Sequence, residues 1–444
     1  MDSNFLGDFF SAFNQILWGW PMIIILIGTH VYLTIRLRFP QRYILKAIKL
    51  SVSKERGSDG DISPLGALMT SLAATVGTGN IIGVATAISL GGPGAVLWCW
   101  LTGVFGMATK YAEALLAVKY REKNSDGQMA GGPMYVLRNG MNLRILPILF
   151  CIFTALAALG IGSMVQANAL SLVVGETLGI SSYVTGAVVA LLVALVVFFG
   201  IKGIARTCTF FVPFMAVFYV LGCVTILILN HAYLADSLAL IVKSAFSVEA
   251  VGGGFLGSSL MVAARYGIAR GLFSNESGMG SAPIVAAAAK SRNPVRQALV
   301  SSSATFWDTV VICALTGLVI VSSCLANPSI DMSASDGTLT YKAFDSLPYV
   351  GHAILAVGIF SFAFSTILGW SYYAEKSIEY MAGVRWVIPY RILFVVAVFV
   401  GAVIKLQVVW DFADCMNALM AIPNLISLIF LAKVAVAETR RFLK

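Results

Sequence analysis

The chain has 444 residues, of which 59% are hydrophobic and 11% are charged, and its mean hydropathy is +0.87. A soluble domain has about a quarter charged residues, so this composition excludes a soluble globular protein and indicates an integral membrane protein. The formal net charge of +9 does not indicate a nucleic-acid partner, because such a partner requires a basic face on a soluble domain.

Apolar segments long enough to cross a bilayer recur along the whole chain. A membrane helix needs about 20 apolar residues, and no segment has the alternating pattern of an outer-membrane barrel. The sequence therefore predicts an all-α integral membrane protein with eleven transmembrane helices, at roughly 17–35, 64–90, 94–118, 145–174, 183–201, 207–229, 254–289, 297–325, 350–374, 387–405 and 408–436.

The positions of lysine and arginine predict the orientation, because these residues accumulate on the cytoplasmic side of a membrane protein. Threading the helices with the N-terminus outside places most of the 30 basic residues in cytoplasmic loops and leaves the C-terminus in the cytoplasm. We therefore expect a multi-pass protein of the plasma (inner) membrane, in contact with the lipid bilayer. The basic stretch from Arg36 to Arg56 is equally compatible with a solvated loop and with a surface on anionic headgroups.

The second predicted span contains GTGNIIG, from Gly77 to Gly83. These letters match the GxGxxG fingerprint of dinucleotide sites, but that fingerprint needs a preceding strand and an acidic residue about 20 positions later. The first acidic residue downstream is Glu113. In a membrane helix, paired glycines loosen the helix and free backbone groups, which is tolerated where those groups face protein or a water-filled cavity. A closely packed glycine face is the alternative.

The seventh predicted span carries a matching interruption. Its GMGS, from Gly278 to Ser281, follows GTGN at a fixed offset of 201 residues. Five helices separate the two motifs, so the second crosses the membrane in the opposite sense. Two such broken helices indicate a transporter with inverted repeats and a substrate site near the midplane. The predicted parts are an N-terminal helix with a basic loop (1–62), a first repeat (63–230) and a second repeat (231–444).

Broken helices expose groups that suit a small zwitterion. The N-termini of half-helices present N–H groups and a positive dipole end to a carboxylate, while free carbonyl and hydroxyl oxygens suit a cation. No charged side chain lies between Ala73 and Gly83, and none is needed for this chemistry.

Three long motifs carry a resemblance to a known family. They are ATVGTGNIIGVATAISLGGPGAVLWCW from Ala74, GGPMYVL from Gly131 and ARGLFSNESGMGSAPIVAAAAK from Ala269. Over essentially its whole length the chain resembles the alanine or glycine:cation symporters, also called sodium:alanine symporters. Leu97 and Cys99 stand where that family has Phe and Met, a departure at packing positions. The resemblance implies a leucine-transporter-like fold of five plus five helices in inverted repeat, with one extra helix in front.

The resemblance also implies site residues. Thr78 and Gly79 would donate to the substrate carboxylate, with Gly77 in the same unwound stretch and Asn80 closing the pocket. The second broken helix would receive the ammonium group through free carbonyls. A sodium site would join carbonyl oxygens of the first broken helix to a Ser-Thr pair; without the resemblance, such a pair more often bonds back to its own helix. The implied second-break residues are Phe273, Ser274, Ser277, Gly278 and Gly280, and the implied sodium ligands are Ala73, Val76, Phe362, Ser365 and Thr366.

Other polar or aromatic residues within the spans have two interpretations. Gln166 is either a pocket donor or an interhelical hydrogen-bond partner, and Trp370 is either a pocket wall or a packing residue. Thr366 is also a candidate substrate contact. Ionisable residues at membrane depth are functional candidates, with structural ion pairing as the alternative. These are Asp308, Glu276, Lys110 and Glu113, and Arg265 with Arg270 are candidates for an outer gate.

The sequence therefore predicts secondary active transport. Inward movement of sodium, the co-transported ion, would drive uptake of alanine, glycine or another small neutral amino acid by alternating access. A proton-coupled transporter of the same fold is the alternative, and a channel is a more distant one. No nucleophile with a base in reach is visible, so an enzyme is not expected. Stoichiometry, the preference among glycine, L-alanine and D-alanine, and the oligomeric state stay open.

Overall fold

The computed structural model describes residues 3–53, 59–247, 260–333, 338–347, 350–404 and 407–443. Helices make up most of this part of the chain. A short hairpin interrupts them, in which β1 (Glu122–Lys123) pairs antiparallel with β2 (Met129–Ala130). The protein is thus helical, as its composition indicates.

The first part of the chain contains a broken helix followed by a long buried one. Ser63 caps α4 by accepting a hydrogen bond from the Gly66 N–H at 3.0 Å, and Pro64 occupies the first turn, so local chemistry defines this helix start. The helix axis bends by 54° between residues 64–75 and 79–91. The elements are α1 (Ser3–Leu17), α2 (Trp20–Arg36), the 3₁₀ turn η1 (Pro40–Tyr43), α3 (Ile44–Ser51), α4 (Pro64–Thr75), the π-helical η2 (Gly79–Gly83), α5 (Val84–Gly91) and α6 (Ala95–Lys119).

The middle part contains one long helix with a π-helical segment and two outer helices. Such π segments within α-helices occur frequently at functional sites. The elements are α7 (Pro133–Tyr135), the π-helical η3 (Val136–Gly140), α8 (Ile145–Ala157), the π-helical η4 (Ala158–Met164), α9 (Val165–Leu178), α10 (Ser182–Val197), α11 (Gly200–Leu229), the 3₁₀ turn η5 (His231–Tyr233) and α12 (Leu234–Phe246).

The last part begins with the second broken helix and ends with a helix in which Ala432, Ala435 and Val436 are buried. The elements are α13 (Leu260–Asn275), α14 (Ala282–Ala287), α15 (Pro294–Thr305), the π-helical η6 (Phe306–Cys313), α16 (Ala314–Ala326), α17 (Leu339–Phe344), α18 (Gly351–Ala382), the 3₁₀ turn η7 (Val384–Trp386), α19 (Val387–Val403), α20 (Gln407–Phe430) and α21 (Ala432–Leu443).

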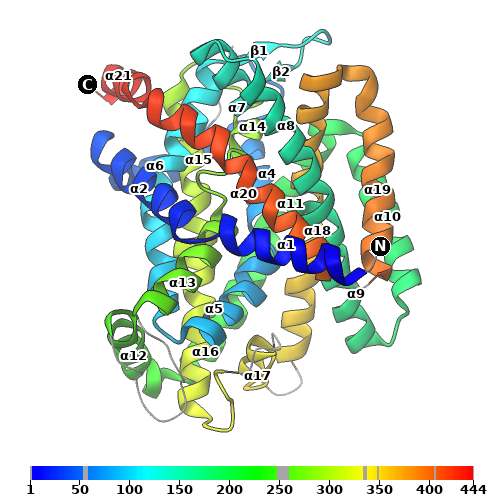
Figure 1. The fold of residues 1–444 in the computed structure, drawn as a ribbon. Coiled ribbons are helices and arrows are strands. Elements are labelled where there is room, and N and C mark those ends of the chain that lie inside the picture. Colours follow the sequence, from blue (N-terminus) through cyan, green and yellow to red (C-terminus); the bar gives the residue numbers. More distant parts are fainter. Residues whose placement is uncertain are drawn as a thin grey trace.

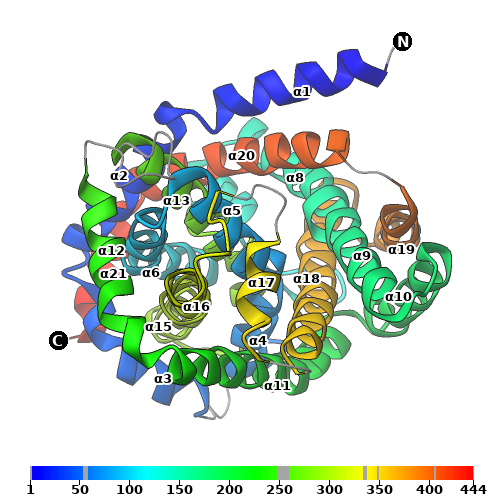
Figure 2. The same ribbon diagram turned by 90° about the horizontal axis from the view of Figure 1, so that it is seen from below.

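The two broken helices lie in the middle of the bundle. The most apolar stretch of α18 is 72% buried, whereas that of α11 and that of the helix Val384–Val403 are each 33% buried, so α18 is central and the other two face outward. Viewed from below, α10 and α19 lie side by side at one edge (Figure 2). α1 runs along the outside of α20, while α12 and α17 lie at the opposite end from the hairpin (Figure 1).

Helices lie in the described part of each predicted span, but non-helical residues 76–77 and 276–281 interrupt the second and the seventh. Six are long and apolar enough to cross a membrane as continuous helices, and up to eight if each bent pair counts as one span. The seventh predicted span, 254–289, is interrupted, as its glycine motif predicts: α13 ends at Asn275 and α14 covers Ala282–Ala287, while residues 254–259 lie outside the described part. The protein is a multi-pass membrane protein on these criteria.

Candidate functional site

The first interruption lies where α4 meets α13 and α18. Val76, directly after α4, leaves helical geometry with a ψ of 93°. A Cβ on Gly77 would lie 2.7 Å from Thr366 Oγ1, and one on Gly79 would lie 3.3 Å from Cδ1 of Phe273. The two glycines therefore allow α18 and α13 to approach the break more closely than larger residues would.

Asp308 connects the two broken helices. Asn80 accepts the Gly77 N–H at 2.8 Å and donates its amide to Asp308 Oδ1 at 2.7 Å. On the other side, Ser274 Oγ donates to Asp308 Oδ2 at 2.9 Å. All these side chains are buried, and hydrogen bonds to a carboxylate are stronger than those between neutral groups. The Asp308 side chain thus joins the first break to the last turn of α13.

The second interruption begins later than predicted. The family resemblance implies Phe273 and Ser274 as residues of this break, but both are still in α13, and the non-helical residues are 276–281. Glu276, Gly278 and Gly280 have left-handed φ angles of 52°, 89° and 88°. A left-handed glutamate is uncommon, and sequence alone gives no reason to place it there.

Glu113 holds the second break in shape from the neighbouring helix α6. Its Oε1 accepts the N–H groups of Gly278 at 3.0 Å and Gly280 at 3.1 Å, and the Asn424 amide at 2.7 Å. Asn424 also donates to the Gly278 carbonyl at 2.8 Å. Asn424 is not among the residues predicted from the sequence; the signal that points to it is a polar residue directly after Pro423 inside an apolar helix.

Further ionisable side chains surround the second break. Lys110 and His30 are buried, with 1% and 0% exposure, and both Lys110 Nζ and His30 Nε2 lack a hydrogen-bond partner among the described residues. The Lys110 charge interacts electrostatically with Glu113, Glu276 and Asp308. Among the residues with described positions, Lys110 forms no ion pair within 4.0 Å.

Among the predicted sodium ligands, Thr366 lies within hydrogen-bond distance of the carbonyl oxygens of Val76 and Phe362. Thr366 Oγ1 lies 3.4 Å from the Val76 carbonyl oxygen, so α18 reaches the first break. Ser365 and Thr366 each donate to the Phe362 carbonyl at 2.9 Å, which is the back-bonding alternative for such a pair. These hydroxyl oxygens keep lone pairs for a cation. Ala73 is buried one turn earlier on α4.

Two further predicted residues occupy different places. Thr78 Oγ1 donates to Gln166 Oε1 at 3.2 Å, and Gln166 Nε2 donates to the Ile161 carbonyl at 3.2 Å, so Gln166 lies at the first break.

Trp370 is 1% exposed and packs against the π-helical η4, where a Cβ on Gly162 would lie 2.5 Å from Trp370 Cβ. Ser277 lies in the second break, where its N–H donates to Asn275 Oδ1 at 2.9 Å.

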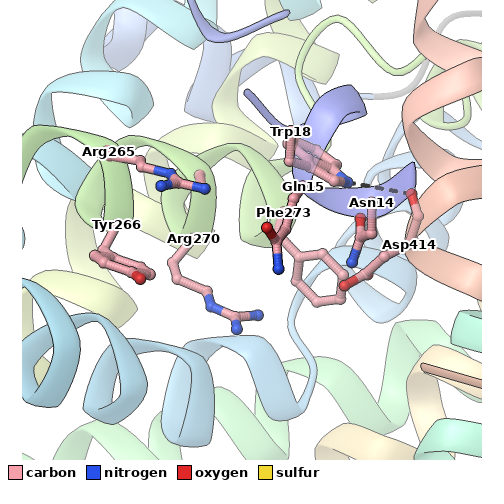
Figure 3. Close-up of a pocket in the computed structure, with 9 residues that line it drawn as sticks. Asn14, Gln15, Trp18, Arg265, Tyr266, Arg270, Phe273 and Asp414 are labelled. Atoms are coloured by element: carbon pink, nitrogen blue, oxygen red, sulfur yellow. Dashed lines mark hydrogen bonds between the residues drawn. The ribbon is translucent and has the colours of Figure 1, made fainter. Parts of the chain in front are cut away.

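A pocket of about 170 Å³ opens next to Phe273. Figure 3 shows Arg265 and Arg270, both from α13, facing a space that Phe273 and Asp414 also line. Trp18 closes one side and donates to the Asp414 carbonyl at 3.2 Å. The predicted outer-gate arginines therefore line one pocket, and because Phe273 also packs on Gly79, this pocket lies next to the first break. Asn14 and Gln15 of α1 also line this pocket, which the sequence does not predict because residues 3–16 precede the first predicted span.

The opposite end of the broken helices is closed by backbone contacts. Ile62 and Ala289 form an isolated β-bridge, which joins the start of α4 to the chain after α14. The Arg121 guanidinium donates to four carbonyl oxygens at 2.7–3.0 Å, and burial lowers its pKa. Those carbonyls belong to Asp59, Ala287, Ala289 and Ser291.

Solved structures of transporters have the same fold as this chain. The structure of MhsT in complex with L-phenylalanine gives a TM-score of 0.60 at 13% identity, covering 87% of this chain and 99% of that one. A substrate-bound outward-open Na⁺-coupled sialic acid symporter gives 0.57 at 12% identity, covering 94% and 98%. At this identity the likeness shows the fold alone, which is that of leucine-transporter-like carriers.

Protein sequences identify the family. The profile described as Sodium:alanine symporter family matches residues 3–444. "Sodium/alanine symporter AgcS" of Methanococcus maripaludis is 48% identical, covering 98% of this chain and 97% of that protein. Two Bacillus subtilis relatives are a "Putative sodium/proton-dependent alanine carrier protein YrbD", at 35% identity with 98% and 92% covered, and a "Probable sodium/glutamine symporter GlnT", at 37% with 95% and 87% covered. The chain therefore belongs to the sodium:alanine symporter family and is a membrane transporter, not an enzyme.

Proposed function

We propose that this transporter couples inward movement of sodium to uptake of a small neutral amino acid, alanine or glycine, by alternating access. The observation that carries the proposal is the meeting of Thr366 Oγ1 and the Val76 carbonyl oxygen at 3.4 Å. A cation at this point would tie the first broken helix to α18 and would order the break beside it.

The oxygen set supports sodium as the ion. Carbonyls of Ala73, Val76 and Phe362 with hydroxyls of Ser365 and Thr366 are neutral oxygen donors, which suit a hard monovalent cation, whereas a transition metal would ask for His, Cys or carboxylate ligands. Among the described residues there is no group of three His, Cys, Asp or Glu side chains that could hold a metal ion. Sodium is therefore the ion that we assign to this set.

The substrate would lie between the two breaks. The N–H groups of Thr78 and Gly79 would receive its carboxylate and carbonyls near Ser277 to Gly280 its ammonium group, because these are the backbone groups that broken helices leave available. Phe273 would separate the substrate from the pocket at Arg265 and Arg270. Asn80 and Ser274 would position this site through Asp308, and Gln166 would fix Thr78. Trp370 would limit the size of the substrate side chain.

The architecture that we assign is the predicted one: an N-terminal helix and two inverted repeats, 63–230 and 231–444, giving eleven spans. The fixed offset between the two glycine breaks supports it. The N-terminus would lie outside and the C-terminus in the cytoplasm, since most basic loops then lie inside. In this orientation the Arg121 contacts would close the cytoplasmic side, and the Phe273 pocket would open outward.

The test is uptake of labelled L-alanine into proteoliposomes under an inward sodium gradient or an inward proton gradient, at equal membrane potential. We expect accumulation above equilibrium with sodium alone. Accumulation with protons alone would overturn sodium coupling and would make Asp308 a candidate for the proton-carrying group. Uptake that never exceeds equilibrium would favour a channel.

The ligand assignment needs its own variant. Thr366→Val removes one oxygen at almost constant volume, and we expect the sodium concentration for half-maximal uptake to rise about tenfold, the value of one ion contact of ~1.4 kcal/mol. Thr154→Val is the matched control, because Thr154 is equally buried and bonds back to Phe150 within α8. An equal rise in both variants would contradict the assignment.

A further inference from the structure

A second hollow, of about 390 Å³, lies at the end of α2. Its walls come from α2, from the turn after it and from α21, which lie side by side in both ribbon views (Figures 1 and 2). Neither aspartate nor glutamate lines it. The polar and charged residues that line this basic pocket are Arg36, Arg38, Arg42, Arg440, Tyr43 and Thr439.

The four arginines of the basic pocket form no ion pair within 4.0 Å with a carboxylate of the described residues. The acidic residue on α21, Glu438, is already engaged with Lys119 at 2.7 Å, and that hydrogen bond lowers its pKa. Arg42 donates a hydrogen bond of 2.7 Å to the Tyr43 hydroxyl, and its guanidinium group lies over the Tyr43 ring. Four positive charges therefore converge on one pocket without a counter-ion from the described chain.

The walls of the pocket are held in place. Arg38 and Phe39 have left-handed φ angles of 59° and 57°, which is unusual for bulky residues and persists only where surrounding contacts impose it. Gln41 supplies such contacts by donating to Thr34 Oγ1 at 3.1 Å and to the Val104 carbonyl at 3.0 Å. On the other wall, Tyr111 bonds Thr439 at 2.9 Å. The arginines thus extend from fixed backbone.

Exposed apolar side chains flank the arginines of the basic pocket in the sequence, and Leu37 and Val436 line the pocket itself. Ile35, Phe39 and Leu45 are 61%, 56% and 80% exposed, and they alternate along the chain with the arginines. A free phosphate ion would need only the charges. An amphiphile with a phosphate headgroup and acyl chains would use both the charges and this apolar border, as in known basic pockets at the ends of membrane helices.

We propose that this basic pocket binds the phosphate headgroup of an anionic phospholipid, with the acyl region against Ile35, Phe39 and Leu45. Of the two interpretations of the stretch from Arg36 to Arg56, the headgroup surface is the one that this geometry favours; Arg56 lies outside the described residues. The proposal depends on the placement of the chain in a membrane and not on which amino acid it carries.

The experiment measures binding of phosphatidylglycerol to the delipidated protein in detergent by native mass spectrometry. The variant is Arg38→Gln/Arg440→Gln, and the control is Arg144→Gln/Arg385→Gln, which removes the same charge from two exposed residues outside the pocket. Loss of two arginines next to a headgroup should weaken binding about thirtyfold, and the control should stay within about threefold of the wild type. Size-exclusion profiles check that both variants are folded.

Three results would overturn the proposal. The first is equal weakening in the control, which would mean attraction by net charge alone. The second is equally tight binding of phosphatidylcholine, which would mean that the anionic charge is not recognised. The third is complete displacement of phosphatidylglycerol by inorganic phosphate at equal concentration, which would identify a phosphate-ion site and not a lipid site.

Discussion

The two broken helices carry the same Gly-x-Gly-polar motif but have different surroundings. The backbone of the first break is surrounded by neutral groups, namely Thr366 Oγ1 near Gly77, the Gln166 amide at Thr78 and the Asn80 amide, and the Asp308 carboxylate reaches this break through the Asn80 side chain. The second is clasped by the Glu113 carboxylate, with Lys110 and His30 close by. The motif interrupts the helix in both places, and the neighbouring helices decide whether the break is held by charge.

This difference indicates that the second break is rigid and that the first break can change its contacts. A carboxylate that accepts two backbone N–H groups makes strong bonds that do not exchange easily, so the second break is a fixed wall. The hydroxyl and amide contacts of the first break are weaker and can exchange for ligand contacts. We therefore expect binding of ion and substrate to reshape the first break more than the second.

The largest effect should come from removing the Glu113 carboxylate, which accepts the N–H groups of Gly278 and Gly280. Glu113→Gln preserves shape but leaves Lys110 as a buried cation with one fewer carboxylate nearby, and we expect a loss of about 3 kcal/mol in unfolding free energy. Thermal unfolding in detergent measures it. The double variant Lys110→Met/Glu113→Gln removes both charges and should recover part of the loss. A single variant as stable as the wild type would show that charge does not hold the second break.

The bridge between the two breaks should come next. Asp308→Asn weakens the acceptors for Asn80 and Ser274, and we expect maximal alanine uptake to fall about thirtyfold, the equivalent of ~2 kcal/mol for hydrogen bonds to a charged group. The swap Asn80→Asp/Asp308→Asn restores a carboxylate and an amide facing each other and should recover much of the rate. No recovery in a folded swap variant would indicate that the carboxylate is needed at Asp308 itself, as in proton coupling.

A smaller effect is expected for Gly77→Ala. Its methyl group would lie 2.7 Å from Thr366 Oγ1, so the two helices must separate slightly, and the half-maximal sodium concentration should rise about tenfold, ~1.4 kcal/mol for one disturbed contact. Gly28→Ala is the control, because nothing lies within 4 Å of a Cβ there. Sodium dependence that is identical in the two variants would place the ion elsewhere.

The smallest effect should come from Gly79→Ala. The added methyl would lie 3.3 Å from Cδ1 of Phe273, a ring that can give way slightly, so we expect the KM for alanine to rise about threefold to fivefold, below 1 kcal/mol. Uptake kinetics at saturating sodium measure it. If the KM for alanine rose more than about tenfold in Gly79→Ala, the larger effect that we assign to the contact at Gly77 would be wrong.

The sequence by itself determined the helical membrane fold and the positions of both breaks to within a few residues, because apolar length and glycine content act locally. It also determined that Val76 and Thr366 are candidates for one ion site, through the family resemblance. The prediction of a membrane transporter is thus confirmed, while the roles of the individual residues at the site stay predictions.

Only the tertiary structure decided the contacts across the bundle. The hydrogen bonds of Glu113 to the second break, and those of Asp308 to Asn80 and Ser274, join residues 34 to 228 positions apart. No periodicity in the sequence encodes such pairs, and none predicts the left-handed backbone of Glu276. The later start of the second break follows from the same cause: Ser274 stays helical where its hydroxyl reaches Asp308, and the chain turns where Glu113 receives the Gly278 and Gly280 N–H groups. Local propensity opens a helix, and the groups packed around it decide its shape.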